Sequence, residues 1–187
     1  GHGQYGDVWM EFEPSGDLET PYIFEERVFG GAVPKNFFPA VEKGLQEAAE
    51  HGSIGGFPVV RLKATLIDGS YHPVDSSEMA FKTAASMAFK DCMKEAQPYL
   101  LEPVDSLKIL LPDDKQGDVM SVLSKRRGSV LGMNSVGGGM TELLAEAPEA
   151  ELGDFALTLR QITQGLGEFT SEFARYDMLP PGTEIKS

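Results

Sequence analysis

The chain has 187 residues, of which 41% are hydrophobic and 24% charged, a balance typical of globular domains that fold in water. Its net charge of −13 argues against non-specific binding to nucleic acid, because neutralising phosphates requires clustered cations. No run of about 18 apolar residues is present to span a membrane. The single cysteine, Cys92, excludes an internal disulfide framework and fits a reducing compartment.

Three strands are predicted in the first half of the chain. Apolar and polar residues alternate over 5–13, and a second strand is expected over 22–29. The third, over 58–67, has one clearly apolar face, made by Val60, Leu62, Ala64 and Leu66. A two-residue period of this kind indicates a sheet with one face on a core.

Two helices are predicted among these strands. Apolar residues recur at spacings of three and four over 36–51, and Gly52 is expected to end that helix. The second helix, over 75–96, is alanine-rich. Asp75 is its expected N-cap, because Glu78 follows three positions later as in a capping box.

The second half of the chain has a clear order of elements. Periodicity predicts strands and helices in the order βαββαβ, which is that of a ferredoxin-like split fold of about 75 residues. The expected segments are a strand over 104–111, a helix over 112–127, a strand over 129–133, a glycine turn over 134–139, a strand over 140–147, a helix over 149–164 and a strand over 166–176. Leu100–Pro103 is interpreted as a hinge, which gives an α+β protein with two domains, 1–102 and 103–187.

The segment Asp68–Lys82 is the most informative part of the chain. It is predicted to contain the end of a strand, a tight exposed loop with His72, and the start of a helix. Pro73 removes a backbone donor and fixes φ within that loop. Polar residues on a loop held between two elements are well placed to contact a partner.

Three residue patterns bear on possible chemistry. His72 and Asp75 are spaced as an acid–base pair, but an exposed loop lacks the walls that strengthen electrostatic catalysis, so a contact role is favoured. His2, His51 and His72 are too scattered to predict a metal site. The sequence contains neither a phosphate-binding P-loop nor a dinucleotide fingerprint.

A basic cluster, Lys125-Arg126-Arg127, lies at the end of a predicted helix. Cations at this position compensate the helix dipole on a solvated surface, or they contact phosphate. The sequence leaves both alternatives open.

At several motifs the chain resembles bacterial translation elongation factor G, over essentially its whole length. The first half resembles domain IV and the second half domain V. The motifs are Gly3-Gln-Tyr-Gly6, Pro39–Gly44, Gly55–Val60, Asp68–Lys82, Leu100–Pro103, Gly117–Val119, Arg126–Gly128 and Thr163–Gly165.

The resemblance implies a module similar to domain 2 of ribosomal protein S5, followed by a ferredoxin-like domain. It implies a cytoplasmic, monomeric part of a longer ribosome-dependent GTPase, with GTP and Mg bound in an N-terminal domain absent from this chain. The expected partner is the ribosome, through rRNA of both subunits and through tRNA–mRNA at the decoding centre, where the tip promotes translocation. No cofactor or catalytic residue is expected in the chain itself.

The resemblance also implies site residues. Contacts with the ribosome and tRNA are expected from a tip of two segments, and contacts with rRNA from the basic cluster. These residues are His72, Pro73, Val74, Asp75, Gly3, Gln4, Tyr5 and Gly6 in the tip, and Lys125, Arg126 and Arg127 in the cluster.

Departures from the family pattern suggest a divergent paralogue. His2 replaces a usual Arg, Pro73 a usual Asp and Leu166 a usual Arg, while Glu151–Phe155 differs from the usual segment. A ribosomal-protection or ribosome-recycling GTPase of the same superfamily is therefore an alternative. A small independent enzyme using His72 and Asp75 is a third hypothesis, and it requires a closed pocket around them.

Overall fold

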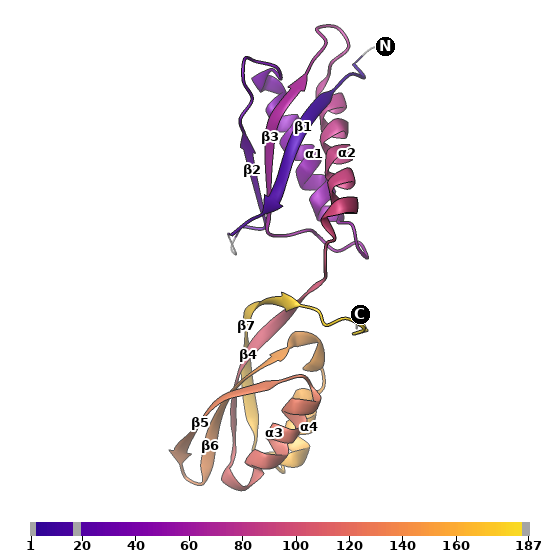
Figure 1. The fold of residues 1–187 in the computed structure, drawn as a ribbon. Helices are drawn as coiled ribbons and strands as arrows, with labels where there is room; N and C mark the ends of the chain where they lie inside the picture. The colour runs from indigo at the N-terminus through magenta and orange to yellow at the C-terminus, as the bar shows by residue number, and fades with distance from the viewer. Residues whose placement is uncertain (1–2, 17–19, 185–187) are drawn as a thin grey trace. The chain divides into compact units, whose positions relative to one another are not determined.

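The computed structural model describes residues 3–16 and 20–184. The chain divides into two compact units, Gly1–Pro98 (unit 1) and Tyr99–Ser187 (unit 2). Each unit has its own sheet, its own pair of α-helices and its own hydrophobic core (Figure 1). The predicted α+β class with two sheet-containing domains is confirmed.

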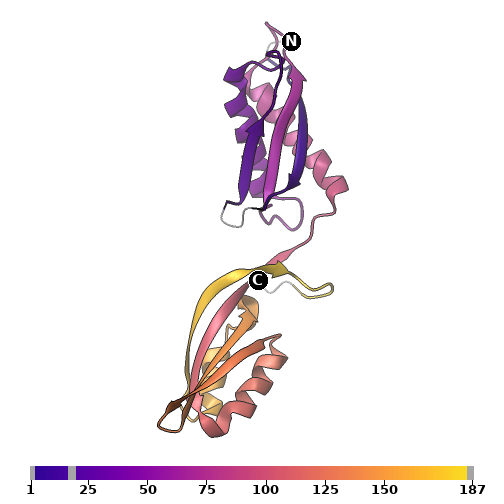
Figure 2. The same cartoon turned by 60° about the vertical axis from the view of Figure 1, so that its left-hand side comes forward.

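Unit 1 is a three-stranded sheet covered on one face by two helices (Figures 1 and 2). The central strand, β3, pairs antiparallel with β1 and parallel with β2. The elements are β1 (Asp7–Pro14), β2 (Tyr22–Glu26), the 3-10 turn η1 (Lys35–Phe37), α1 (Phe38–His51), β3 (Leu62–Ser70) and α2 (Glu78–Ala96).

The core of unit 1 lies between the sheet and the two helices. Phe81 and Phe89 of α2 and Leu45 of α1 are at most 1% exposed. The helices approach closely at Gly44, where an added Cβ would lie 2.3 Å from the carbonyl oxygen of Lys82. Cys92 packs against this core, and burial raises the pKa of its thiol.

The third strand is shifted along the chain relative to its prediction over 58–67. Arg61 has a φ of 58°, which lies outside strand geometry, so the strand begins at Leu62. It continues through Gly69, where an added Cβ would lie 2.2 Å from the carbonyl oxygen of Asp7. The glycine therefore lets β1 pair with the strand right up to the tip. Strand β2 is shorter than the predicted 22–29 and ends at Glu26.

Unit 2 has a fully antiparallel sheet in the order β5-β6-β4-β7, with both helices on one face (Figure 1). This is the βαββαβ arrangement that the sequence predicted. The elements are β4 (Leu101–Pro112), η2 (Asp113–Lys115), α3 (Gln116–Lys125), β5 (Ser129–Gly137), β6 (Met140–Pro148), η3 (Glu149–Glu151), α4 (Phe155–Ile162) and β7 (Glu168–Met178).

Two predictions for unit 2 are corrected. Leu101–Pro103 is not a hinge, because these residues pair with β7, and the division between the units falls at Pro98/Tyr99. The glycine turn predicted over 134–139 contracts to Gly138-Gly139, which both have positive φ, as a tight hairpin requires. Strand β5 therefore extends to Gly137.

Within the described ranges, no helix combines the length and the apolar character needed to cross a membrane.

Candidate functional site: the tip of unit 1

The tip of unit 1 consists of the β3–α2 loop, residues 71–77, and the segment Gly3–Gly6, which lie at the same end of the unit (Figure 1). The Tyr5 N–H donates to the carbonyl oxygen of Asp75 at 2.8 Å, and Tyr5 forms an isolated parallel bridge with Ser76. The Ser77 hydroxyl donates to the carbonyl oxygen of Gly3. The two predicted tip segments are thus joined by hydrogen bonds, although they are far apart in the sequence. His2, one of the departures from the family pattern, lies outside the described residues.

A relay of hydrogen bonds fixes the ring of Tyr5. The Ser70 hydroxyl donates to Asp7 Oδ2 at 2.8 Å, which leaves its oxygen to accept from the Tyr5 hydroxyl at 2.6 Å. The ring of Tyr5 meets that of His72 edge-on, with centroids 6.5 Å apart and planes at 63°. Strand pairing between β1 and β3 therefore positions the Tyr5 ring that packs against His72.

Ser77, and not Asp75, is the N-cap of α2. Its backbone is extended, with φ −149° and ψ 163°, and its hydroxyl accepts from the Ala80 N–H at 3.1 Å. The helix begins at Glu78, so the predicted capping box of Asp75 and Glu78 is wrong. Asp75 belongs to the loop, where its carbonyl oxygen accepts from Tyr5.

His72 organises the loop through its own side chain. Its Nδ1 accepts from the Val74 N–H at 3.3 Å and from the Asp75 N–H at 3.1 Å. Its backbone N–H donates to Ser76 Oγ at 2.8 Å, and its carbonyl oxygen accepts from the Ser76 N–H at 3.0 Å. These hydrogen bonds around one residue hold the loop in a defined shape.

The side chains at the tip are open to solvent. The side chain of His72 is 53% exposed, that of Asp75 is 36% exposed, and Val74 is 71% exposed. Gln4 and Pro73 are exposed as well. This exposure contradicts the hypothesis of an independent enzyme, which requires His72 and Asp75 in a closed pocket.

The loop that follows β2 adds an aromatic residue that the sequence placed in a strand. Phe29 is 92% exposed and precedes Gly30 and Gly31, which both have positive φ. Because β2 runs parallel to β3, this loop leaves the sheet at the end that carries the tip. The two glycines after Phe29 are typical of a turn, but the β-propensity of the preceding residues led to a strand being predicted through Phe29.

In the basic cluster of unit 2, Arg126 is held by groups of unit 2 itself. Its guanidinium donates to the carbonyl oxygen of Glu151 and to Asp154 Oδ1, each at 2.6 Å. It also lies 5.6 Å from the centroid of the Phe155 ring. These contacts favour a structural role for Arg126.

Arg127 is also engaged within unit 2. Its two terminal nitrogens donate to the two carboxylate oxygens of Glu102, whose side chain is only 10% exposed. This hydrogen bonding raises the pKa of the guanidinium. Lys125 is exposed at the end of α3. Of the three cluster residues, Lys125 is therefore the best placed to reach a partner.

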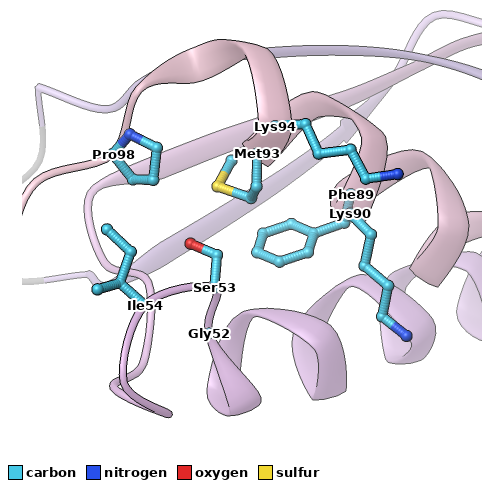
Figure 3. A pocket seen from close by; sticks show the side chains of 8 residues that line it. All are labelled: Gly52, Ser53, Ile54, Phe89, Lys90, Met93, Lys94 and Pro98. Atoms are coloured by element: carbon cyan, nitrogen blue, oxygen red, sulfur yellow. The ribbon is translucent and has the colours of Figure 1, made fainter.

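A shallow groove lies at the other end of the helices of unit 1 (Figure 3). Ser53 and Ile54 face Phe89, Lys90 and Met93 of α2 across it. Phe89 is 1% exposed and belongs to the core of unit 1, so the floor of the groove is part of that core. It contains none of the predicted site residues.

The chain matches known proteins over both units. The family model "Elongation factor G, domain IV" matches residues 1–97, and "Elongation factor G C-terminus" matches residues 99–184. An "Elongation factor G-like protein" of Thermotoga maritima is 45% identical over 186 residues, which are 100% of this chain and 27% of that protein. A crystal structure of a Thermus thermophilus protein is similar with a TM-score of 0.88 and 48% identity, over 97% of this chain and 27% of that one.

The family models over both units identify the chain as part of a translation elongation factor. The chain belongs to the elongation factor G family, with domain IV in unit 1 and the C-terminal domain in unit 2. It spans 27% of the length of the Thermotoga maritima protein and 27% of the length of the Thermus thermophilus protein.

Proposed function

We propose that this chain is the ribosome-contacting arm of an elongation factor G-like translational GTPase, and that it promotes tRNA–mRNA translocation by placing its tip at the decoding centre. The observation that carries the proposal is the tip itself. It lies within the matched domain IV, is held by its own hydrogen bonds, and exposes His72, Pro73 and Val74. A preformed loop loses little conformational entropy on binding.

The proposed mechanism is steric. GTP and Mg bind in a part of the protein outside this chain, since residues 1–187 contain no P-loop sequence. The arm occupies the decoding region and biases tRNA movement, with the segment Gly3–Gly6 bracing the loop that carries His72. This role belongs in the cytoplasm, and the chain acts as a monomer with the ribosome as its partner.

Contact with rRNA from unit 2 is proposed for Lys125. Arg126 and Arg127 are assigned to the structure of unit 2, because their guanidinium groups pair with Asp154 and Glu102.

A second candidate is a ribosomal-protection or recycling factor built on the same domains. The exposed Pro73, which the sequence resemblance marked as a departure from the family pattern, keeps this candidate open. A role in tetracycline rescue or subunit splitting, with little translocation by the full-length protein, would support this candidate.

Replacing His72 with Ala in the full-length protein tests the leading proposal. We expect slowed tRNA–mRNA movement and nearly normal GTP hydrolysis, because the tip is remote from nucleotide chemistry. Movement is followed by mRNA toeprinting and hydrolysis by phosphate release in the same reactions. Unchanged movement together with unchanged ribosome binding would refute the assignment of the tip.

A further inference from the structure

We propose that the shallow groove of unit 1 is a docking site for an acidic peptide segment of a partner protein, in which an apolar side chain lies next to Asp or Glu. The groove lies at the end of the helices opposite to the tip, and none of the tip residues line it. The inference therefore stands apart from the function proposed above.

The floor and one end of the groove are apolar. Phe89 is 1% exposed and Met93 is 9% exposed, so the core of unit 1 fixes the floor. At one end stand Ile54, which is 37% exposed, and Pro98 (Figure 3). The volume is about 520 Å³, but a groove this shallow does not enclose a small molecule as most ligand pockets do. It suits side chains that a larger partner presents.

Two lysines give the opposite end of the groove a positive charge. In Figure 3, the amino groups of Lys90 and Lys94 lie on the same side of the groove, away from its apolar end. Each lysine follows a floor residue of α2 by one position, so both border the groove. Asp91 and Glu95 come one residue later and are turned about 100° further around the helix. The charge that α2 presents to the groove is therefore positive.

Both amino groups are accessible to a partner. Lys90 is exposed and forms no ion pair within the part of the chain that the structure describes. Lys94 pairs with Asp91 at 3.2 Å, but the two side chains are 76% and 73% exposed, and solvent screens such a pair. A carboxylate of a docking peptide can therefore replace Asp91 with little loss.

The loop that borders the groove is held in a defined shape. Gly52 has a φ of 68°, and a side chain at this position would overlap the carbonyl oxygen of Phe57. The Phe57 N–H donates to the carbonyl oxygen of Ile54 at 3.1 Å. The Val59 N–H donates to the carbonyl oxygen of Ala49, in α1, at 2.7 Å. A groove that is formed before binding loses little conformational entropy when a partner docks.

The chemistry of the groove favours a peptide over RNA. Unpaired bases bind by stacking on exposed aromatic rings, and the ring of Phe89, the aromatic residue among those that line the groove, is buried. The net charge of −13 also opposes the approach of a phosphate backbone. An acidic peptide satisfies both ends of the groove, because its apolar side chain covers Ile54 while its carboxylates reach the two lysines.

NMR chemical-shift mapping on the 187-residue chain tests the proposal with three probes. They are the capped peptide Glu-Asp-Leu-Phe-Glu-Asp, its uncharged counterpart Gln-Asn-Leu-Phe-Gln-Asn, and a short oligouridylate. We expect the acidic peptide to shift the backbone amides of Ser53, Ile54, Lys90 and Lys94. The uncharged peptide should bind about fivefold more weakly, the effect of two exposed ion pairs, and the RNA should leave these amides unchanged.

Matched variants separate the groove from the general charge of the chain. One double variant, Lys90→Gln with Lys94→Gln, removes the cations of the groove. The other, Lys43→Gln with Lys108→Gln, removes two exposed lysines elsewhere and changes the net charge equally. We expect about fivefold weaker binding of the acidic peptide for the first and wild-type affinity for the second. Ile54→Ser should weaken binding about threefold, because apolar contact is lost.

Several results would overturn the proposal. Unchanged groove amides in the presence of the acidic peptide would refute docking, and equal losses in the two double variants would refute the role of the lysines. Larger shifts with the RNA than with the acidic peptide would overturn the choice of partner. The same peptide, carrying a fluorophore, is also titrated into the full-length protein and followed by anisotropy. Binding to the 187-residue chain but not to the full-length protein would show that the groove is covered there, which contradicts docking of a partner.

Discussion

At the scale of single residues, Tyr22 links the stability of unit 1 to pH. Its hydroxyl donates to the carbonyl oxygen of Glu42 at 3.4 Å, and burial, followed by the charge of Glu42, raises its pKa far above the usual value. The contribution of the protonated Tyr22 hydroxyl to folding stability is fully present below the unfolded-state pKa of tyrosine, about 10. It is lost as pH rises further, because only the unfolded chain then releases the tyrosine proton.

We therefore predict that unit 1 loses stability between about pH 10 and 11, and that Tyr22→Phe loses less. The two proteins should differ in the slope of unfolding free energy against pH. This difference is expected to stay below the limit of about 1.4 kcal/mol per pH unit, because the hydroxyl is partly exposed and solvent screens it. Urea unfolding followed by fluorescence of Trp9, the single tryptophan and a residue of unit 1, measures it. Equal slopes for both proteins would contradict the prediction.

The sequence identified the tip residues but not how they are held. His72 and Tyr5 were named from motifs, and the structure places them in contact. The relay from Asp7 through Ser70 to Tyr5 joins residues whose proximity depends on strand register, which one sequence does not reveal. The sequence also did not predict that Arg126 and Arg127 form ion pairs, because their acidic partners are distant in the sequence.

At the scale of elements, the start of α2 depends on Ser77. Ser77→Ala removes the cap on the Ala80 N–H and the hydrogen bond to Gly3, and we expect a loss of about 1–2 kcal/mol in unfolding free energy. Asp75→Ala is the matched control two residues earlier, and it should cost clearly less because its carbonyl bond to Tyr5 is kept. Urea unfolding monitored at Trp9 compares them, and a larger cost for Asp75→Ala would contradict the assignment.

Two glycines in helices predict opposite effects of the same substitution. Gly44→Ala places a Cβ 2.3 Å from the Lys82 carbonyl oxygen, so α1 and α2 must separate at a cost of about 1–3 kcal/mol. Gly117→Ala in α3 meets no atom within 4 Å and should stabilise unit 2 by about 0.5–1 kcal/mol. Thermal unfolding followed by circular dichroism measures both. A neutral or stabilising effect of Gly44→Ala would show that close helix packing does not explain the glycine at 44.

Element types were predictable because periodicity is strong, whereas several boundaries were not. The cap of α2 was misplaced because Asp75 and Ser77 are both good capping residues, and tertiary contacts with Gly3 decide between them. The strand β3 was shifted because a positive φ at Arg61 carries no sequence signal. The strand was predicted to end at Ile67, whereas it continues through Gly69, which leaves room for β1.

At the scale of the whole molecule, the chain carries a net charge of −13 although its proposed partner is rich in RNA. General electrostatic attraction therefore does not explain binding. Recognition by a shaped, hydrogen-bonded tip is compatible with this charge, because it depends on a few placed groups. The two-domain α+β organisation followed from the order of elements and from the family motifs, and both units bear it out.

Directed hydroxyl-radical probing tests most directly whether the tip reaches the decoding centre. Cys92 and every cysteine outside this chain are replaced by Ser, and an iron chelate is attached to Val74→Cys at the tip or to Met87→Cys on α2, positions that are 71% and 60% exposed. With the full-length protein bound to ribosomes, we predict that position 74 cleaves small-subunit rRNA at the decoding centre and that position 87 does not give this pattern. Bound protein whose position 74 leaves decoding-centre rRNA intact would contradict the account.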